Sequence, residues 1–181
     1  MASMKKHPSL EIDYRSTVKF SSQEKKKLEL WLKYSSRVVE KLLSEKIIPL
    51  KGINLSTVRV SLLICGDSRM RGLNREYRGK DKVTDVLSFP SAEGLRAGSI
   101  KNYVVGGEMF LGDLAICNEQ TKRQAKRFSI SYWDEFIHLY FHGILHLLGF
   151  DHELSSKEEK LMQKWEERAL KIFSETKKKG A

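Results

Sequence analysis

Three histidines that could share one metal ion lie close together in the second half of the chain. His142 and His146 are four positions apart, so on a helix they lie one turn apart on the same face. Gly149 follows where a helix commonly ends in a left-handed turn, which would bring His152 back toward the same point. Three imidazoles that leave a fourth position to water are the ligand set of a catalytic zinc site. We therefore predict one zinc ion bound by these three side chains.

The residue after the first histidine bears on the kind of reaction. The same histidine spacing occurs in the H-E-x-x-H-x-x-G-x-x-H pattern of one zinc-protease group, whose glutamate is the general base for attack on a peptide. In this sequence that position is Gly143, which has no side chain. A zinc-dependent peptidase is therefore the weaker alternative, and activity on a panel of peptides would decide it.

The composition favours a folded protein with an acidic partner. Of the 181 residues, 40% are hydrophobic and 31% are charged, which is ordinary for a globular protein. The net charge of +10 makes RNA or DNA the first expectation for a partner and an anionic membrane the second. We predict a single domain over residues 1–181 whose ends, 1–10 and 175–181, are flexible.

Cysteine usage and hydropathy predict a cytoplasmic protein that is not membrane-bound. Cys65 and Cys117 lack CxxC-type neighbours, so we expect two buried thiols in a reducing compartment. The N-terminus shows no apolar segment followed by a small-residue cleavage site. The apolar stretch 136–150 is too short to span a bilayer.

Hydrophobic periodicity predicts about four strands and several helices. Alternation predicts strands over 11–20, 58–64, 86–89 and 109–116, the last interrupted by Gly112-Asp113, with a Gly-rich loop over 91–107. Helical spacing predicts five helices. The first covers 21–47 and begins with a capping box, and the second runs from a cap at Asp67 or Ser68 to residue 77. The third covers 118–128 with Asn118 as its cap, the fourth begins at about 131, and the fifth covers 156–173. The predicted fold class is α/β (α+β). It is a small mixed sheet of about four strands packed with helices, and the zinc site lies on a helix and turn in the C-terminal half.

The predicted helix over 118–128 carries a run of basic side chains: Lys122, Arg123, Lys126 and Arg127. A run of charge is most often a solvated face. Because the chain also has a positive net charge and a predicted zinc site, a second interpretation is open. The run could line an electropositive groove that leads to the metal and holds a single RNA strand through its phosphates.

Three separate blocks of the sequence resemble the YbeY endoribonuclease family. The family pattern H-G-x-L-H-L-x-G-[YF]-D-H matches residues 142–152, a second block, LNREYRGKDKVTDVLSFP, matches residues 73–90, and a third, LGDLAI, matches residues 111–116. Val83 stands where the family usually has proline, and Phe150 stands where tyrosine is commoner.

The resemblance implies a metal-dependent endoribonuclease that cuts single-stranded RNA and takes part in ribosomal RNA maturation and ribosome quality control. It also implies zinc on the three histidines, and it places the functional arginine of the family at Arg78. The chemistry of arginine also favours this role, because its fixed fork of N–H donors suits phosphate oxygens and the negative charge that develops on them. The attacking group, water or the 2′-hydroxyl of the RNA, is left open.

A rival from another class is a non-catalytic protein that binds RNA or the ribosome and has a structural zinc. A structural zinc site usually has a fourth protein ligand. The sequence offers only Cys65, Cys117 or a carboxylate for that position.

The roles of several other polar residues are left as alternatives. Asp113 either makes a strand-end turn or accepts a hydrogen bond that orients a ligand histidine. His138, one turn before His142, is either a satisfied core histidine or a polar group lining the cleft. Asp151 is expected to form a turn. Glu108 is a general base by residue type alone, since nothing in the sequence determines its position.

Overall fold

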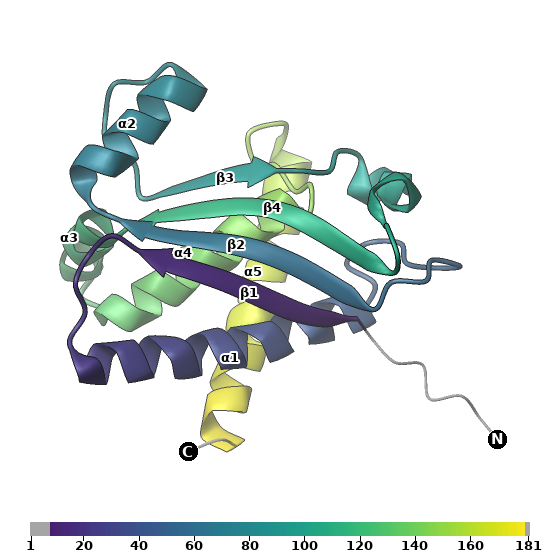
Figure 1. Ribbon diagram of the computed structural model, residues 1–181, viewed down its shortest axis with the longest axis horizontal. Helices are drawn as coiled ribbons and strands as arrows, with labels where there is room; N and C mark the ends of the chain where they lie inside the picture. The colour runs from purple at the N-terminus through teal and green to yellow at the C-terminus, as the bar shows by residue number, and fades with distance from the viewer. Residues whose placement is uncertain (1–7, 180–181) are drawn as a thin grey trace.

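The computed structural model describes residues 8–179, in which a four-stranded sheet packs with helices (Figure 1). The strands are β1 (Ser9–Ser16), β2 (Thr57–Cys65), β3 (Val86–Pro90) and β4 (Glu108–Cys117). Their order across the sheet is β1-β2-β4-β3, so β1 and β3 are the edge strands. β1, β2 and β4 are parallel, and β3 is antiparallel to β4. The predicted α/β (α+β) class with a small mixed sheet is confirmed.

Five α-helices and two short 3-10 helices complete the described part of the chain: α1 (Ser22–Ser44), α2 (Asp67–Arg78), η1 (Leu95–Ala97), η2 (Ser99–Tyr103), α3 (Asn118–Phe128), α4 (Tyr132–Leu147) and α5 (Ser156–Lys179). The predicted capping box begins α1. The Ser21 hydroxyl accepts a hydrogen bond from the Glu24 N–H, and the Glu24 carboxylate accepts one from the Ser21 N–H. The segment predicted as a plain loop contains η1 and η2. Their buried side chains Leu95 and Ile100 attach this segment to the core.

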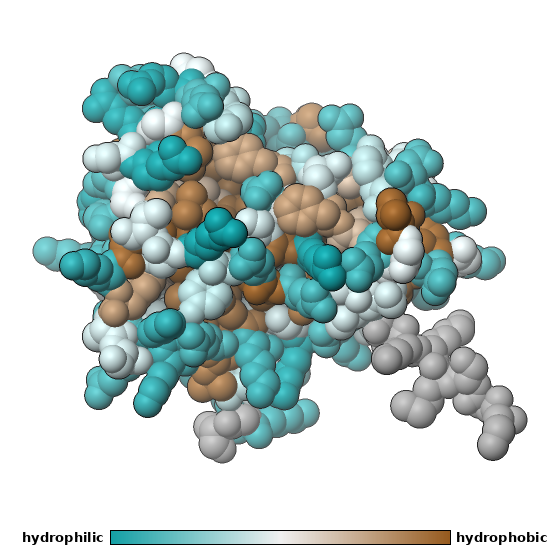
Figure 2. Space-filling model, viewed as in Figure 1, coloured by the Kyte–Doolittle hydropathy of each residue, from teal (hydrophilic) through white to brown (hydrophobic). Residues whose placement is uncertain are grey.

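The helices are distributed unequally over the two faces of the sheet. α1, α4 and α5 cover one face, where they form the main core with the inward side chains of the strands (Figure 1). Of the described helices only α2 covers the other face, and only at one end, where Met70 and Leu73 pack on Leu87 and Ala115. The rest of this second face, here called the open face, carries Arg59, Ser61, Phe110 and Asp113. Figure 2 shows it as a mixture of hydrophilic and hydrophobic side chains.

The predicted interruption of a strand at Gly112-Asp113 is wrong, because β4 is continuous there. Instead, the register between β2 and β4 shifts and leaves Leu111 without a partner, as in a β-bulge. Gly112 has a φ of 142°, and a Cβ at this position would lie 2.3 Å from the Phe89 carbonyl oxygen. The glycine is therefore required by its backbone conformation and by the close approach of β3.

Parts of the two ends predicted as flexible lie in regular elements of the structure. β1 begins at Ser9 and Leu10 is buried, while residues 1–7 lie outside the described residues. α5 continues beyond Phe173 to Lys179. Its last turns have contacts of their own, since Phe173 packs edge-on against Trp31 at 5.1 Å and the Lys177 ammonium lies over the same ring at 4.8 Å.

The predicted side-chain caps of two helices are also wrong. Asp67 is the first residue of α2, behind Gly66, and its carboxylate binds Arg123 instead of the helix end. Asn118 is the first residue of α3, and its side-chain oxygen accepts a hydrogen bond from the Tyr132 hydroxyl at 2.9 Å. Both side chains connect neighbouring elements, a use that local sequence patterns do not show.

We expect Gly112→Ala to lower the free energy of unfolding by about 2 kcal/mol or more, because both the φ and the Phe89 carbonyl exclude a Cβ. Chemical denaturation would measure the loss. Gly72→Ala in α2 is the matched control: a Cβ there meets nothing within 4 Å, and alanine favours the helix. Equal stability of the two variants would contradict this account of β4.

Candidate metal centre

The structure brings the three histidines together, with one nitrogen of each ring within 4.8 Å of the others. The ring centroids of His142 and His146 are 4.7 Å apart, and that of His152 lies 5.3 and 5.2 Å from them. The Nε2 atoms of His142 and His146 are 3.1 Å apart. Zinc–nitrogen bonds of about 2.0–2.1 Å in a tetrahedral site place two ligand nitrogens about 3.3 Å apart. The three residues could therefore hold one metal ion.

The turn that presents His152 depends on Gly149, whose φ is 89°. The Gly149 N–H donates to the His146 carbonyl, and the Phe150 N–H donates to the Leu145 carbonyl, both at 3.0 Å. These paired bonds are those of a Schellman motif, which reverses the chain at a helix end. The predicted left-handed stop is confirmed, and it directs the following residues back toward α4.

Arg96 of η1 holds this turn from outside. Its guanidinium carbon lies 4.3 Å from the centroid of the Phe150 ring, and its nitrogens pair with the Glu158 carboxylate at the start of α5. The segment between β3 and β4 thus connects the turn to α5. No role was predicted for Arg96, because no local sequence pattern relates it to residues so far along the chain.

A carboxylate on α5 supports the first histidine. Nδ1 of His142 lies 2.6 Å from Oε1 of Glu166, whose side chain is largely buried. A carboxylate at Nδ1 holds the proton there and leaves the Nε2 lone pair for a metal. Glu166 was not among the predicted site residues. The signal was available, because Met162, Glu166 and Ala169 follow one helical stripe that is otherwise apolar and buried.

The environment keeps the middle histidine uncharged. Burial, and then the imidazoles of His142 and His152, lower the pKa of His146 to about 4. This ring is therefore neutral at pH 7, which is the form that binds a metal.

Gly143 faces the sheet instead of the histidines. A Cβ at this position would lie 2.2 Å from Cδ1 of the buried Leu114, and the Gly143 carbonyl accepts a hydrogen bond from the Ser88 hydroxyl at 3.3 Å. A side chain here would point into the core. The position cannot supply the general base of the zinc-protease pattern, so the geometry does not support the peptidase alternative.

A cleft of about 560 Å³ opens beside the three histidines along the edge of β3. Arg78, the last residue of α2, lines this cleft, and its Nη2 donates to the Ser88 carbonyl at 3.2 Å. That single bond positions the guanidinium and leaves most of its donors for a ligand. Arg78 and the histidines, which are far apart in the sequence, therefore line one cavity.

Two more cations line the cleft: Lys80 and Lys82. Several polar contacts attach the loop that carries them to α2. Asp81 makes a two-bond pair with Arg71, at 2.9 and 2.7 Å, and the Asn74 amide donates to the Lys82 carbonyl at 2.8 Å. The positive charge at the metal cleft therefore comes from α2 and the loop after it.

Asp113 lies away from the metal site. It is exposed on the open face, on the opposite side of the sheet from α4, so its interpretation as an acceptor for a ligand histidine is wrong. Simple alternation from Met109 and Leu111 would have turned Asp113 inward. The bulge at Leu111 displaces the alternation by one residue, and the carboxylate turns outward.

His138 does not line the cleft either. Its side chain is 45% exposed, and Nδ1 lies 3.7 Å from the buried carboxylate of Glu135. It is neither the satisfied core histidine nor the cleft-lining group that the sequence allowed. Asp151 does form the expected turn, since its carboxylate accepts a hydrogen bond from the Glu153 N–H at 2.9 Å. Glu108 pairs instead with Arg59 at the start of β4 and does not line the cleft.

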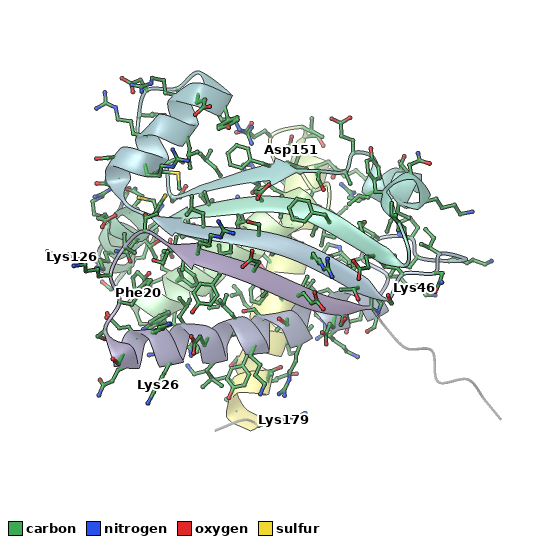
Figure 3. All side chains as sticks on the ribbon, in the orientation of Figure 1. Phe20, Lys26, Lys46, Lys126, Asp151 and Lys179 are labelled. Atoms are coloured by element: carbon green, nitrogen blue, oxygen red, sulfur yellow. The ribbon has the colours of Figure 1, made fainter. Side chains whose placement is uncertain are left out.

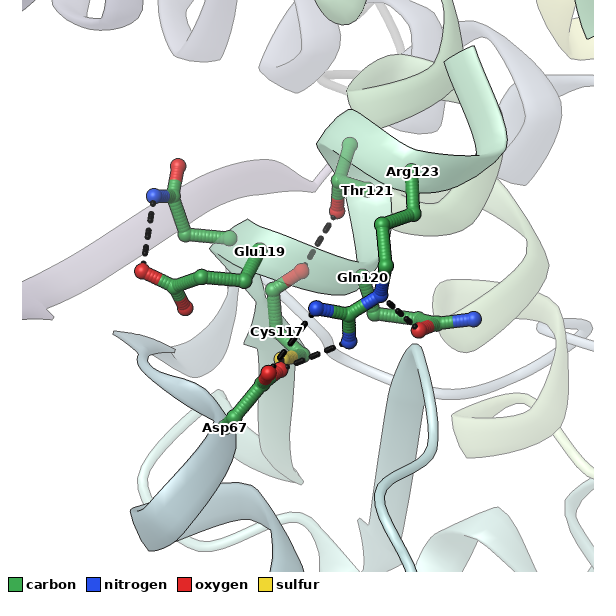
Figure 4. A network of polar contacts seen from close by, with 7 residues as sticks. Asp67, Cys117, Glu119, Gln120, Thr121 and Arg123 are labelled. Carbon is green, nitrogen blue, oxygen red and sulfur yellow. Dashed lines mark hydrogen bonds and ion pairs between the residues drawn. The ribbon is translucent and has the colours of Figure 1, made fainter. Parts of the chain in front are cut away.

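The basic residues of α3 do not lead to the metal. None of Lys122, Arg123, Lys126 and Arg127 lines the cleft, and Figure 3 shows Lys126 well apart from Asp151. Arg123 is used within the fold, where it donates two bonds of 2.8 Å to Asp67 and one to Gln120 (Figure 4). The structure gives the groove interpretation of this run no support, because none of its four side chains lines the cleft.

A second group of possible ligands lies in this network: Asp67, Cys117 and Glu119 (Figure 4). Arg123 already engages both oxygens of Asp67, and burial raises the pKa of Cys117 to about 12. A protonated thiol beside a guanidinium is a poor cation site. Both cysteines are buried and free, as predicted.

Known proteins are similar to this chain in sequence. The family model described as Endoribonuclease YbeY matches residues 19–174, a range that contains the three histidines, Arg78 and Glu166. The chain belongs to the YbeY endoribonuclease family. The similar YbeY proteins include those of Leptospira interrogans, 44% identical over 135 residues (71% of this chain, 96% of that protein), and Aquifex aeolicus, 38% identical over 156 residues (85% and 97%).

A solved structure also has this fold. The solution structure of TM1509 from Thermotoga maritima matches with a TM-score of 0.55 at 23% identity, over 94% of this chain and 93% of that one. As for the predicted absence of membrane spans, no helix within residues 8–179 has the length and apolar character needed to cross a bilayer.

We expect Glu166→Ala to weaken zinc binding about 10–100-fold, because His142 loses the group that holds its Nδ1 proton. Competition with a chromophoric chelator would measure the affinity. Glu167→Ala is the matched control, since Glu167 lies next in α5 and, within residues 8–179, its side chain bonds only to the exposed Gln163. If the two variants bind zinc equally well, Glu166 does not support the site.

Proposed function

We propose that this protein is a zinc-dependent endoribonuclease that cuts single-stranded RNA, with one zinc ion held by His142, His146 and His152. One observation carries the proposal: the three imidazoles and the phosphate-seeking Arg78 line the same cleft. Membership of the YbeY family supports the reaction, since the matching relatives are named as endoribonucleases.

The donor set fits a catalytic zinc better than a structural one. Within residues 8–179, the ligand atoms gathered at this point come from three histidines, with no thiol or carboxylate among them. Both cysteines are buried beneath α2, on the other face of the sheet. A site with three protein ligands keeps a position for water or substrate, which a structural site does not. This argues against the non-catalytic rival with structural zinc.

The residues of the site have different roles in the proposed reaction. A zinc ion held by the histidines supplies a Lewis acid for a phosphate oxygen and lowers the pKa of a water. Arg78 binds the phosphate and stabilises the charge that develops on it, from a position set by the Ser88 carbonyl. Lys80 and Lys82 hold the RNA backbone, and Glu166 keeps His142 in the tautomer that binds metal.

The attacking group is either water or the 2′-hydroxyl of the RNA. An RNA with a single 2′-deoxy nucleotide on the 5′ side of the cut distinguishes them, because only attack by water continues on that substrate. The proposed substrate is ribosomal RNA during its maturation and quality control, with the ribosome as partner, in the cytoplasm. The net charge of +10 supports an RNA partner, and the two free thiols suit a reducing compartment.

We expect Arg78→Ala to lower kcat for RNA cleavage about 100–1,000-fold, because the phosphate loses its charge-stabilising donor. Zinc content, measured by metal analysis, and thermal stability should stay near those of the unmodified protein. Arg75→Ala is the matched control, since Arg75 lies one turn earlier on α2 and pairs with Asp81 outside the cleft. Cleavage at the unmodified rate by Arg78→Ala would contradict the assignment.

The affinity for RNA should depend more on where the positive side chains lie than on the net charge of the protein. We expect Lys80→Glu/Lys82→Glu to weaken RNA binding about tenfold or more, and to reduce the salt dependence of the dissociation constant. Lys122→Glu/Lys126→Glu on α3 makes the same change in net charge away from the cleft and should have a much smaller effect. Binding titrations at several salt concentrations would compare the two. A larger effect from the α3 pair would restore α3 as the RNA-binding surface.

A further inference from the structure

A second cavity, of about 350 Å³, lies on the open face beside α2. Its volume is in the range of sites for small organic groups, about 300–1,000 Å³. Leu63 and Leu73 form apolar walls, and Tyr77 and Phe89 form an aromatic pair with ring centroids 5.1 Å apart. Figure 2 shows hydrophobic side chains reaching the surface below α2. The cavity is therefore mainly apolar, with an aromatic side.

α2 forms a wall of both this cavity and the metal cleft. Asn74 and Arg78, one turn apart, line the cleft. The residue before each of them, Leu73 and Tyr77, lines the open-face cavity. Two neighbouring stripes of one helix therefore serve the two cavities, and Tyr77 is adjacent in the chain to the arginine proposed to bind phosphate.

β3 divides the two cavities. Ser88 and Pro90 line the metal cleft, and Phe89 between them lines the open-face cavity. Adjacent residues of a strand point to opposite faces, so the cavities lie on the two sides of this edge strand. A polynucleotide that crosses the edge of β3 can place a phosphate in the cleft and the neighbouring base in the cavity.

The polar groups of the cavity favour a neutral ring with N–H donors. Asp113 and Ser61 line it, and in residues 8–179 neither of their side chains has a hydrogen-bond or ion-pair partner. No lysine, arginine or histidine of the described chain lines the cavity. A carboxylate without a cation repels phosphate and accepts hydrogen bonds from amino and imino groups.

The exposure of Tyr77 suits stacking. The residue is 58% exposed, although its ring makes an edge-to-face contact with Phe89. Proteins that bind single-stranded RNA stack splayed bases on such rings and bind the base edges with nearby polar groups.

We propose that the open-face cavity binds a nucleobase of the single-stranded RNA substrate, next to the phosphate held by Arg78. The base stacks on Tyr77, and Asp113 accepts hydrogen bonds from its edge. Guanine fits best, because its adjacent N1–H and N2–H groups match the two oxygens of a carboxylate. This inference rests on the proposed function, and it supplies a reason for single-strand preference, since a paired base cannot leave its stack to enter the cavity.

Steady-state cleavage of a single-stranded oligoribonucleotide tests the subsite. We expect Tyr77→Ala to raise KM roughly tenfold, because one base can no longer stack. The kcat and the zinc content should stay near those of the unmodified protein. Tyr77→Phe should keep the original KM, because the ring remains. Phe110→Ala is the matched control: Phe110 is an exposed aromatic residue of the same face that does not line this cavity.

The substrate provides the complementary test. An abasic nucleotide at one position beside the cut should raise KM by the same factor as Tyr77→Ala, and it should add nothing in that variant, because both changes remove one interaction. At that position, guanosine should be cut with a lower KM than uridine, and Asp113→Asn should reduce the difference. These changes in the RNA decide the question even if Tyr77→Ala does not fold.

The outcomes separate the subsite from the proposed function. Absence of RNA cleavage by the unmodified, zinc-loaded protein would defeat the proposed function itself. Cleavage with an unchanged KM for Tyr77→Ala and for every abasic substrate would overturn the subsite alone. An equal rise in KM for Phe110→Ala would also overturn it, since the effect would belong to the whole face. Equal KM values for guanosine and uridine would remove Asp113 from the proposal.

Discussion

Three imidazole nitrogens can meet at one point only under two conditions. The chain must be rigid up to the second histidine, and it must reverse direction before the third histidine. α4 meets the first requirement by packing into the core, with Gly143 directly against Leu114. Gly149 meets the second, because its positive φ allows the two hydrogen bonds that turn the chain back. Arg96 and Glu166 then hold the turn and the first ring from other elements.

The edge strand β3 organises the surroundings of this centre. Its backbone supplies the carbonyl that positions Arg78, and its residues Ser88 and Pro90 line the metal cleft while Phe89 between them lines the open-face cavity. Because β3 is at the edge of the sheet, a substrate can approach both faces there. α2 reinforces the arrangement by packing on the open face and ending at the cleft.

Charge alone was a poor guide to the binding surface. The run on α3 is a conspicuous basic segment, yet Arg123 is engaged with Asp67 and none of the four basic side chains lines the cleft. Lys80 and Lys82 are less conspicuous in the sequence, but their loop is tied to α2 beside the cleft. An electrostatic partner is recognised by where charges gather in space, and net charge reports only their sum.

The sequence by itself determined the features that depend on neighbouring residues: the helical spacing of His142 and His146, the left-handed stop at Gly149, the capping box of α1 and the class of the sheet. These follow from backbone geometry that repeats over a few positions. Family membership followed from three matched blocks, and it was confirmed. Only the tertiary structure decided which face Asp113 occupies, since a bulge changed its side, and which carboxylate meets His142, since Glu166 comes from another helix. Contacts between elements depend on how whole helices and strands pack, and no short stretch of sequence contains that information.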